Sequence, residues 1–153
     1  MINISQHLGE TMAIYRGRLS LAEPVKPGSD DVLLDDGLTI NKTNLDALFS
    51  ERLLFDWRGE RFLLTKYQDG IVSGMLYTPN DAFAREHRLT GDPYMGWGGE
   101  FPEREIESVW VEKFDMLGSW QYRKEMGQQA PHGLYVFVRP ASQQEWIREE
   151  PST

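Results

Sequence analysis

Three glutamates at alternating positions are the first residues in this chain whose spacing could support chemistry. Glu103, Glu105 and Glu107 would share one face of a β-strand, because successive side chains of a strand point to opposite faces. Carboxylates held together repel one another, and that repulsion can raise a pKa into the range useful for acid–base catalysis. The same pattern is also typical of a solvated outer face or of a surface that docks a basic partner. We therefore predict no catalytic residue and keep an enzyme that uses carboxylates as an alternative.

Histidine and cysteine usage gives little further support for catalysis. The sequence has three histidines, His7, His87 and His132, and none has a second ligand at the spacing that metal sites use. We expect His87 on a short charged helix and His132 in a glutamine-rich loop, both facing solvent. Cysteine is absent, which excludes disulfides, thiolate nucleophiles and cysteine-ligated metal sites. We predict no metal and no cofactor, and an enzyme would have to use these two histidines with Glu103 and Glu105.

Two familiar ligand-binding motifs begin in the sequence and are not completed. The acidic stretch 30–37 starts like a calcium-binding loop, but Val32 and Leu34 stand where carboxylates or amides are required. The glycines of segment 96–98 start like a dinucleotide-binding fingerprint, which needs another glycine at the position that Phe101 occupies. The chain also contains no phosphate-binding loop and no zinc-protease HExxH pattern. Because these motifs are incomplete or absent, the sequence favours a binding function over catalysis.

The segment 92–102 combines aromatic and acidic residues in a way that predicts a binding surface. It holds three glycines, two prolines and three aromatic residues, a composition that predicts an irregular loop. Large aromatic side chains on a loop must pack back onto the domain or contact a partner, and Trp and Tyr are frequent interface anchors. The predicted partner-binding residues are these aromatic side chains and their acidic neighbours: Asp92, Tyr94, Trp97, Glu100, Phe101, Glu103 and Glu105.

The charge balance indicates what kind of partner such a surface would bind. Lys and Arg total 16 against 24 Asp and Glu, so the net charge is −8. The longest basic run is the pair Arg123–Lys124, too short for the basic face of a nucleic-acid binder. We therefore predict no direct nucleic-acid binding and expect a basic protein partner. The resulting hypothesis is a small acidic inhibitory protein that occludes its partner, such as a toxin-immunity protein (an antitoxin) or an inhibitor of a nucleic-acid enzyme.

The high aromatic content leaves a second binding hypothesis open. Aromatic residues make up 12% of the chain, and Trp57, Trp110 and Trp120 fall in predicted strands. Such side chains normally pack in the core, but alternating strand aromatics can also line a ligand cavity. A barrel-like carrier of a small ligand is therefore the alternative. We further expect a cytoplasmic protein with no membrane partner, because the sequence shows neither a long apolar span nor a signal-like start.

The helices and strands that would position these residues are expected to form one domain, which spans residues 1–153. The fold class is α+β, mainly antiparallel, with a curved or barrel-like sheet of about six to eight short strands and two or three short helices. Helices are expected at 43–54, 81–89 and 142–148, the last with a capping box from Ser142 to Glu145. Strands are expected at 11–21 (bent at Gly17), 53–57, 62–67, 71–77, 104–114, 119–124 and 133–139, and the short apolar pieces 32–34 and 38–40 flank a hairpin-turn signal.

Overall fold

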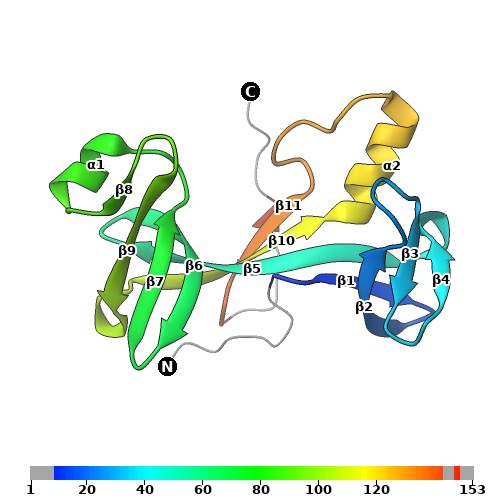
Figure 1. Ribbon diagram of the computed structural model, residues 1–153, viewed down its shortest axis with the longest axis horizontal. Helices are drawn as coiled ribbons and strands as arrows, with labels where there is room; N and C mark the ends of the chain where they lie inside the picture. The colour runs from blue at the N-terminus through cyan, green and yellow to red at the C-terminus, as the bar shows by residue number, and fades with distance from the viewer. Residues whose placement is uncertain (1–8, 143–146, 149–153) are drawn as a thin grey trace. The chain divides into compact units, whose positions relative to one another are not determined.

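The computed structural model describes residues 9–142 and 147–148 and is mainly antiparallel β-structure with two short α-helices (Figure 1). The helices are α1 (Asp81–Glu86) and α2 (Met116–Met126), and single 3-10 turns are η1 (Lys42–Asn44) and η2 (Glu103–Glu105). The strands are β1 (Thr11–Tyr15), β2 (Arg18–Pro24), β3 (Asp31–Leu34), β4 (Thr39–Asn41), β5 (Ala47–Trp57), β6 (Glu60–Gln68), β7 (Ile71–Leu76), β8 (Thr90–Asp92), β9 (Gly96–Pro102), β10 (Ser108–Asp115), β11 (Val136–Pro140) and the short β12 (Ile147–Arg148).

The strand order corrects the predicted sheet. The main path runs β4-β3-β2-β1-β5-β6-β7-β9-β8, while β10 pairs with β5 and β11, and β11 pairs with β12. Because β4 and β8 end this path, the sheet is not closed, and the prediction of a curved or barrel-like sheet is wrong. The structure also has more strands than the six to eight predicted. No helix in the described part of the chain is long and apolar enough to cross a membrane.

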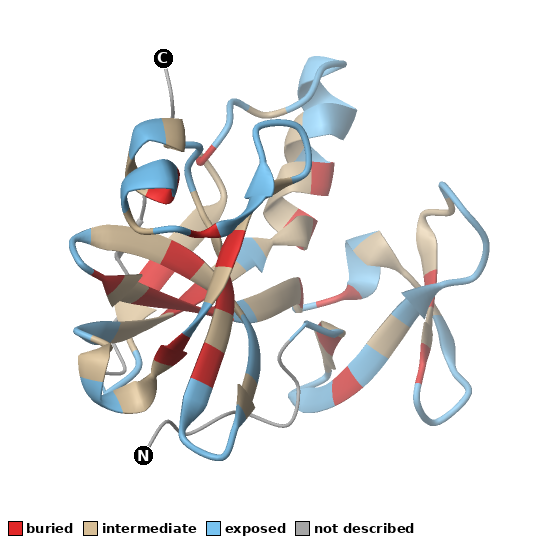
Figure 2. Ribbon diagram, turned by 60° about the vertical axis from the view of Figure 1, so that its left-hand side comes forward, coloured by how far each residue is buried: buried red, intermediate tan, exposed pale blue. Residues whose placement is uncertain are grey.

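By their contacts, the described residues fall into two compact units, which share β5 and β10 between them. The first unit contains Arg52–Val111, whose buried residues are marked in Figure 2, and aromatic rings make up much of its core. The rings of Phe55 and Phe62 stack with centroids 5.2 Å apart, and Trp57 lies 4.3 Å from Phe101 between ring centroids. Rings in such close contact bury much area each, so they stabilise the unit that carries the predicted site.

The second unit contains residues 9–51 and Glu112–Arg139, and it packs α2 against one face of its strands. Ala13 of β1 pairs with Ser20 of β2 and with Leu48 of β5. The alternating inward residues of these strands meet Leu117 and Trp120 of α2, which are three positions apart and therefore lie on one side of the helix. This contact buries an apolar layer between helix and sheet.

The turns were the most predictable part of the fold. Strands β5, β6 and β7 form the expected antiparallel meander, with the Arg58–Gly59 and Asp69–Gly70 turns at its corners. All four turn residues have positive φ, the conformation that a tight two-residue hairpin turn requires. The expected hairpin around residues 35–37 is also present between β3 and β4. Asn80 caps α1 as predicted, because its side chain accepts a hydrogen bond from the backbone N–H of Phe83.

The helix predicted at 43–54 is wrong, because β5 occupies residues from Ala47 onward. Leu45, Leu48 and Phe49 have helical spacing, but the same residues also fit a strand with one buried face. Pairing with β1 near the start of the strand and with β6 near its end decides between them. Long-range backbone pairing overrides a weak local periodicity here.

The strand predicted at 119–124 is also wrong, since these residues belong to α2. Asp115 caps the helix by accepting a hydrogen bond from the backbone N–H of Gly118, and Gly127 ends it in the left-handed conformation. Both signals are in the sequence, but the aromatic residues between them favoured a strand prediction.

The remaining differences concern single elements. The bent strand predicted at 11–21 is the β1–β2 hairpin, because Arg16 and Gly17 both have positive φ. The loop predicted at 92–102 is mostly the β8–β9 hairpin. The capped helix predicted at 142–148 falls largely outside the described residues, whose last pair forms β12.

We predict that Asp30 stabilises the second unit in a pH-dependent way. Hydrogen bonds from Lys124 and Trp120 hold the pKa of the Asp30 carboxyl below its ordinary value of 3.8. A lowered carboxyl pKa adds stability that is complete above the unfolded-state pKa and lost as pH falls through the folded-state pKa. Asp30→Asn should therefore lower the free energy of unfolding in urea at about pH 7, and this loss should shrink towards about pH 2.

Asp69→Asn is the matched control for this prediction, because it removes the same charge in the β6–β7 turn. It should leave the urea midpoint nearly unchanged, since asparagine also tolerates positive φ. An equal loss from Asp30→Asn at both pH values would contradict the ion-pair explanation.

Candidate functional site

The β8–β9 hairpin carries the centre of the predicted binding surface on a fixed turn. The hairpin tip, defined here as residues 92–95, joins Asp92 of β8 to Gly96 of β9. Asp92 Oδ1 accepts hydrogen bonds from the backbone N–H groups of Tyr94 (2.8 Å) and Met95 (2.7 Å). Gly91 has φ +130°, and a Cβ there would lie 2.0 Å from the carbonyl oxygen of Gly96. Strand pairing, an aspartate and a glycine therefore fix the tip without help from its apolar side chains.

Those apolar side chains are consequently available at the surface. Tyr94 is 96% exposed and Met95 is 81% exposed, the highest values among the large hydrophobic residues that the structure describes. Two adjacent large side chains with this exposure are unusual on a protein surface, where single exposed apolar residues are the rule. Met95 was not among the predicted site residues, although its position beside Tyr94 could have suggested it.

The two other predicted aromatic residues belong to the packed body of the first unit. Trp97 is half-buried, and its indole N–H donates to Asp81 Oδ1 at 2.8 Å. Phe101 is only 4% exposed and packs among the core rings. Phe101 therefore positions β9 and contributes no accessible surface, so we leave it out of the candidate site.

The predicted acidic residues are not gathered around the tip. Glu100 is exposed on β9, whereas Glu103 and Glu105 follow the end of that strand. Seven strand residues span about 20 Å, so these two glutamates lie at the far end of β9 from the tip. Of the predicted residues, the structure thus leaves Asp92 and Tyr94 together at the tip.

The alternating glutamates do not share a strand face, which corrects the pattern considered for acid–base chemistry. Glu103 and Glu105 belong to the 3-10 turn η2, and the three carboxylates accept hydrogen bonds from different groups. Glu103 accepts from the Tyr67 hydroxyl at 2.6 Å, Glu105 from the Trp57 indole at 3.4 Å, and Glu107 from the Gly59 backbone N–H at 2.9 Å. These bonds tie the η2 segment to the β5–β6–β7 meander.

The histidines give no catalytic arrangement either. His87 ends α1, and its ring packs 4.4 Å from Phe83 and 5.3 Å from Trp57 between centroids, so the solvent-facing expectation is wrong for this residue. His132 is exposed, as expected. Within the described ranges, no group of three or more His, Cys, Asp or Glu residues is arranged to hold a metal ion.

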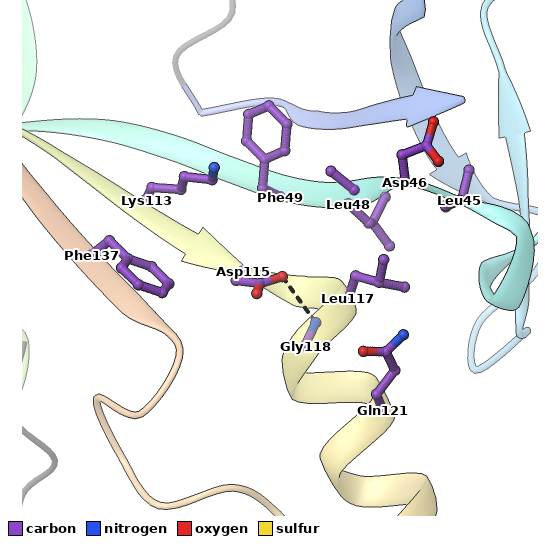
Figure 3. Close-up of a pocket in the computed structure, with 11 residues that line it drawn as sticks. Leu45, Asp46, Leu48, Phe49, Lys113, Asp115, Leu117, Gly118, Gln121 and Phe137 are labelled. Carbon is purple, nitrogen blue, oxygen red and sulfur yellow. Dashed lines mark hydrogen bonds between the residues drawn. The ribbon is translucent and has the colours of Figure 1, made fainter. Parts of the chain in front are cut away.

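The second unit contains an open cavity that the sequence did not reveal. It has a volume of about 450 Å³ and lies where α2 leaves the sheet beside the start of β5 (Figure 3). Its lining combines aliphatic, aromatic and charged side chains with small residues: Leu45, Asp46, Ala47, Leu48, Phe49, Lys113, Asp115, Leu117, Gly118, Gln121 and Phe137. The residues come from three distant segments, so no local motif marks the cavity.

A wider cleft of about 590 Å³ lies in the first unit and is mainly polar. Its carboxylates already hold neighbouring groups: Asp56 accepts hydrogen bonds from the side chains of Arg61 and Trp110. Glu107 accepts from Gly59, as described above. The cleft is therefore lined by groups that stabilise the fold.

Comparison of the chain with protein-family models, curated proteins and solved structures finds no match.

We predict that Asp92 is the residue that fixes the hairpin tip. Asp92→Ala removes the acceptor of two backbone N–H groups, each bond contributing about 1 kcal/mol. Hydrogen–deuterium exchange at Tyr94 and Met95 should then become faster, while exchange in β6 and β7 stays unchanged. Asp92→Asn keeps a side-chain oxygen at the same position and should retain most of the protection. If the amides of Tyr94 and Met95 exchange as slowly in Asp92→Ala as in Asp92→Asn, the side chain of residue 92 does not hold the turn.

Proposed function

We propose that this protein is a small acidic binding protein that occludes a basic protein partner, with the hairpin tip as its anchor. The observation that carries the proposal is the exposure of Tyr94 and Met95 on a turn that is built without them. Neither side chain stabilises the tip by burial in the unit that displays it. Burial against a partner gives both of them a role.

A rigid tip is well suited to binding. Association is opposed by the entropy lost when loops and side chains become ordered, and a preformed turn has little backbone freedom left to lose. Tyr94 brings a large ring with few rotatable bonds, and Met95 adapts its shape to irregular pockets. Once desolvated in a partner's pocket, such side chains mainly slow dissociation.

The charge of the chain supports a basic partner. The net charge is −8, and the exposed residues Asp92 and Glu100 lie on the two strands that the tip joins. Arg85 and Arg88 reduce this local excess without reversing it. Acidic surface accelerates association with a basic protein, and this acceleration weakens as salt screens the charges. Proteins that act on nucleic acids carry basic surfaces, so a toxin or another nucleic-acid enzyme is the partner class that fits.

Two observations favour this proposal over the alternatives. The rings that could have lined a carrier's ligand cavity pack against one another, as Trp57 does against Phe62 and Phe101. The carboxylates considered for catalysis accept hydrogen bonds that hold the η2 segment in place. The tip, in contrast, has no comparable internal role for its two largest side chains.

Affinity capture from lysates of the source cells, at low and at high salt concentration, tests whether the protein binds a basic partner. Wild-type protein should retain a near-stoichiometric basic protein that is lost as the salt concentration rises. Tyr94→Ala with Met95→Ser should weaken the complex by about 2 kcal/mol, or roughly thirtyfold in Kd, mainly through faster dissociation. Surface plasmon resonance with the captured protein measures both rates.

Met126→Ser is the matched control, because Met126 is 57% exposed at the end of α2 in the other unit. It should bind like the wild type. The proposal is wrong if the tip variant binds as tightly as this control, or if no basic protein is retained at low salt.

A further inference from the structure

Methionine thioethers are the only sulfur groups that this chain offers to oxidants, because it contains no cysteine. The structure describes the methionines at positions 12, 75, 95, 116 and 126. Met95 is 81% exposed at the hairpin tip, Met126 is 57% exposed at the end of α2, and Met12 is 4% exposed in β1. A dissolved peroxide therefore reaches the Met95 side chain more readily than that of any other described methionine.

Two half-buried methionines differ from Met95 because their side chains pack inside the protein. Met75 Sδ lies against β9, since a Cβ at Gly98 would be only 2.7 Å from it. Met116 packs against the apolar core of the second unit. An oxygen atom added to either sulfur would have to enter closely packed protein, which slows the oxidation and disturbs the packing when it occurs.

Oxidation of Met95 changes the chemistry of the hairpin tip and keeps its shape. The turn is held by Asp92 Oδ1, which accepts the backbone N–H groups of Tyr94 and Met95 at 2.8 and 2.7 Å. Both bonds involve only the backbone of residues 94 and 95, so they survive a change in the Met95 side chain. The thioether is apolar and flexible, whereas its sulfoxide is polar. Because burial of a polar group without a hydrogen-bond partner is costly, the oxidised side chain is a poor apolar anchor.

We propose that Met95 is a reversible oxidation site that sets the affinity of the hairpin tip for its partner. A peroxide is the oxidant: one of its oxygen atoms is transferred to Met95 Sδ, the O–O bond breaks, an S=O bond forms, and water leaves. The sulfur gives up two electrons in this step and the peroxide takes them. Methionine sulfoxide reductases reverse the step with electrons from a thiol. The inference rests on the function proposed above, because the affinity that oxidation lowers is that of the tip.

Peptide mapping by mass spectrometry after brief treatment with dilute hydrogen peroxide tests the site without any partner. Sulfoxide should form at Met95 at least roughly threefold faster than at Met75 and Met116, and slowest at Met12. The urea midpoint should stay unchanged while only Met95 and Met126 are oxidised. Treatment with the two methionine sulfoxide reductases, one for each sulfoxide epimer, and dithiothreitol should restore the thioethers.

Two leucine variants assign the effect on binding to one methionine. Leucine is apolar, close to methionine in volume and inert to peroxide. In Met126→Leu, as in the wild type, peroxide treatment followed by catalase should weaken binding of the captured basic protein about tenfold, the loss expected when one buried methionine side chain stops contributing. In Met95→Leu, treated and untreated protein should have the same Kd, whatever the starting affinity of that variant. Met95→Gln, which carries a polar oxygen in place of the sulfoxide, should bind as weakly as the oxidised wild type without any treatment.

Each outcome decides either the inference or the proposed function. Sulfoxide formation at Met95 no faster than at Met75 would show that Met95 is not the oxidation site. Equal weakening in Met95→Leu and Met126→Leu, or no weakening in the wild type, would show that oxidation of Met95 does not control binding, while the untreated complex would still support the proposed function. If untreated protein retains no basic partner, the proposed function fails and the control of its affinity fails with it.

Discussion

Backbone pairing of β5 with β1, β6 and β10 is the constraint on which the rest of the structure depends. Leu48 near its start pairs with β1, and Leu54 and Phe55 nearer its end pair with β6. All three side chains are almost completely buried, and they contribute to the interiors of the units that share the strand. The cavity beside Ala47 and the meander that supports the hairpin tip both follow from where β5 is paired. A helix at 43–54 would remove both.

The sequence predicted those parts of the fold whose cause is local. Positive φ at Arg58 and Asp69 follows from the turn that their glycines permit, and the Asn80 cap follows from its own side chain. The glycines of 96–99 misled the prediction, because they read as a loop. In the structure they allow close packing: a Cβ at Gly98 would lie 2.7 Å from Met75 Sδ. Close packing of this kind depends on a neighbouring strand, so it cannot be inferred from the sequence of one segment.

The residues of the candidate site were likewise predictable only where their pattern is local in the sequence. Asp92 and Tyr94 were found because an aspartate, a proline and an aromatic residue in a turn are a local pattern. Phe101 was misplaced, because alternation along β9 turns it inward, and Glu103 lies beyond the end of that strand. The cavity was missed because its lining comes from β5, β10, α2 and β11. The acidic residues thus have two uses: several stabilise segments of the fold, and together they give the charge to which a basic partner responds.

The decisive measurement is site-specific photo-crosslinking in the source cells, with a benzophenone side chain in place of Tyr94. Because that side chain is almost fully exposed, the replacement should leave the fold intact. Crosslinking of a basic protein from position 94, and none from position 126 at the end of α2, is the predicted result. Absence of a crosslink from position 94, or the same crosslinked proteins from both positions, would contradict the role of the hairpin tip as the anchor.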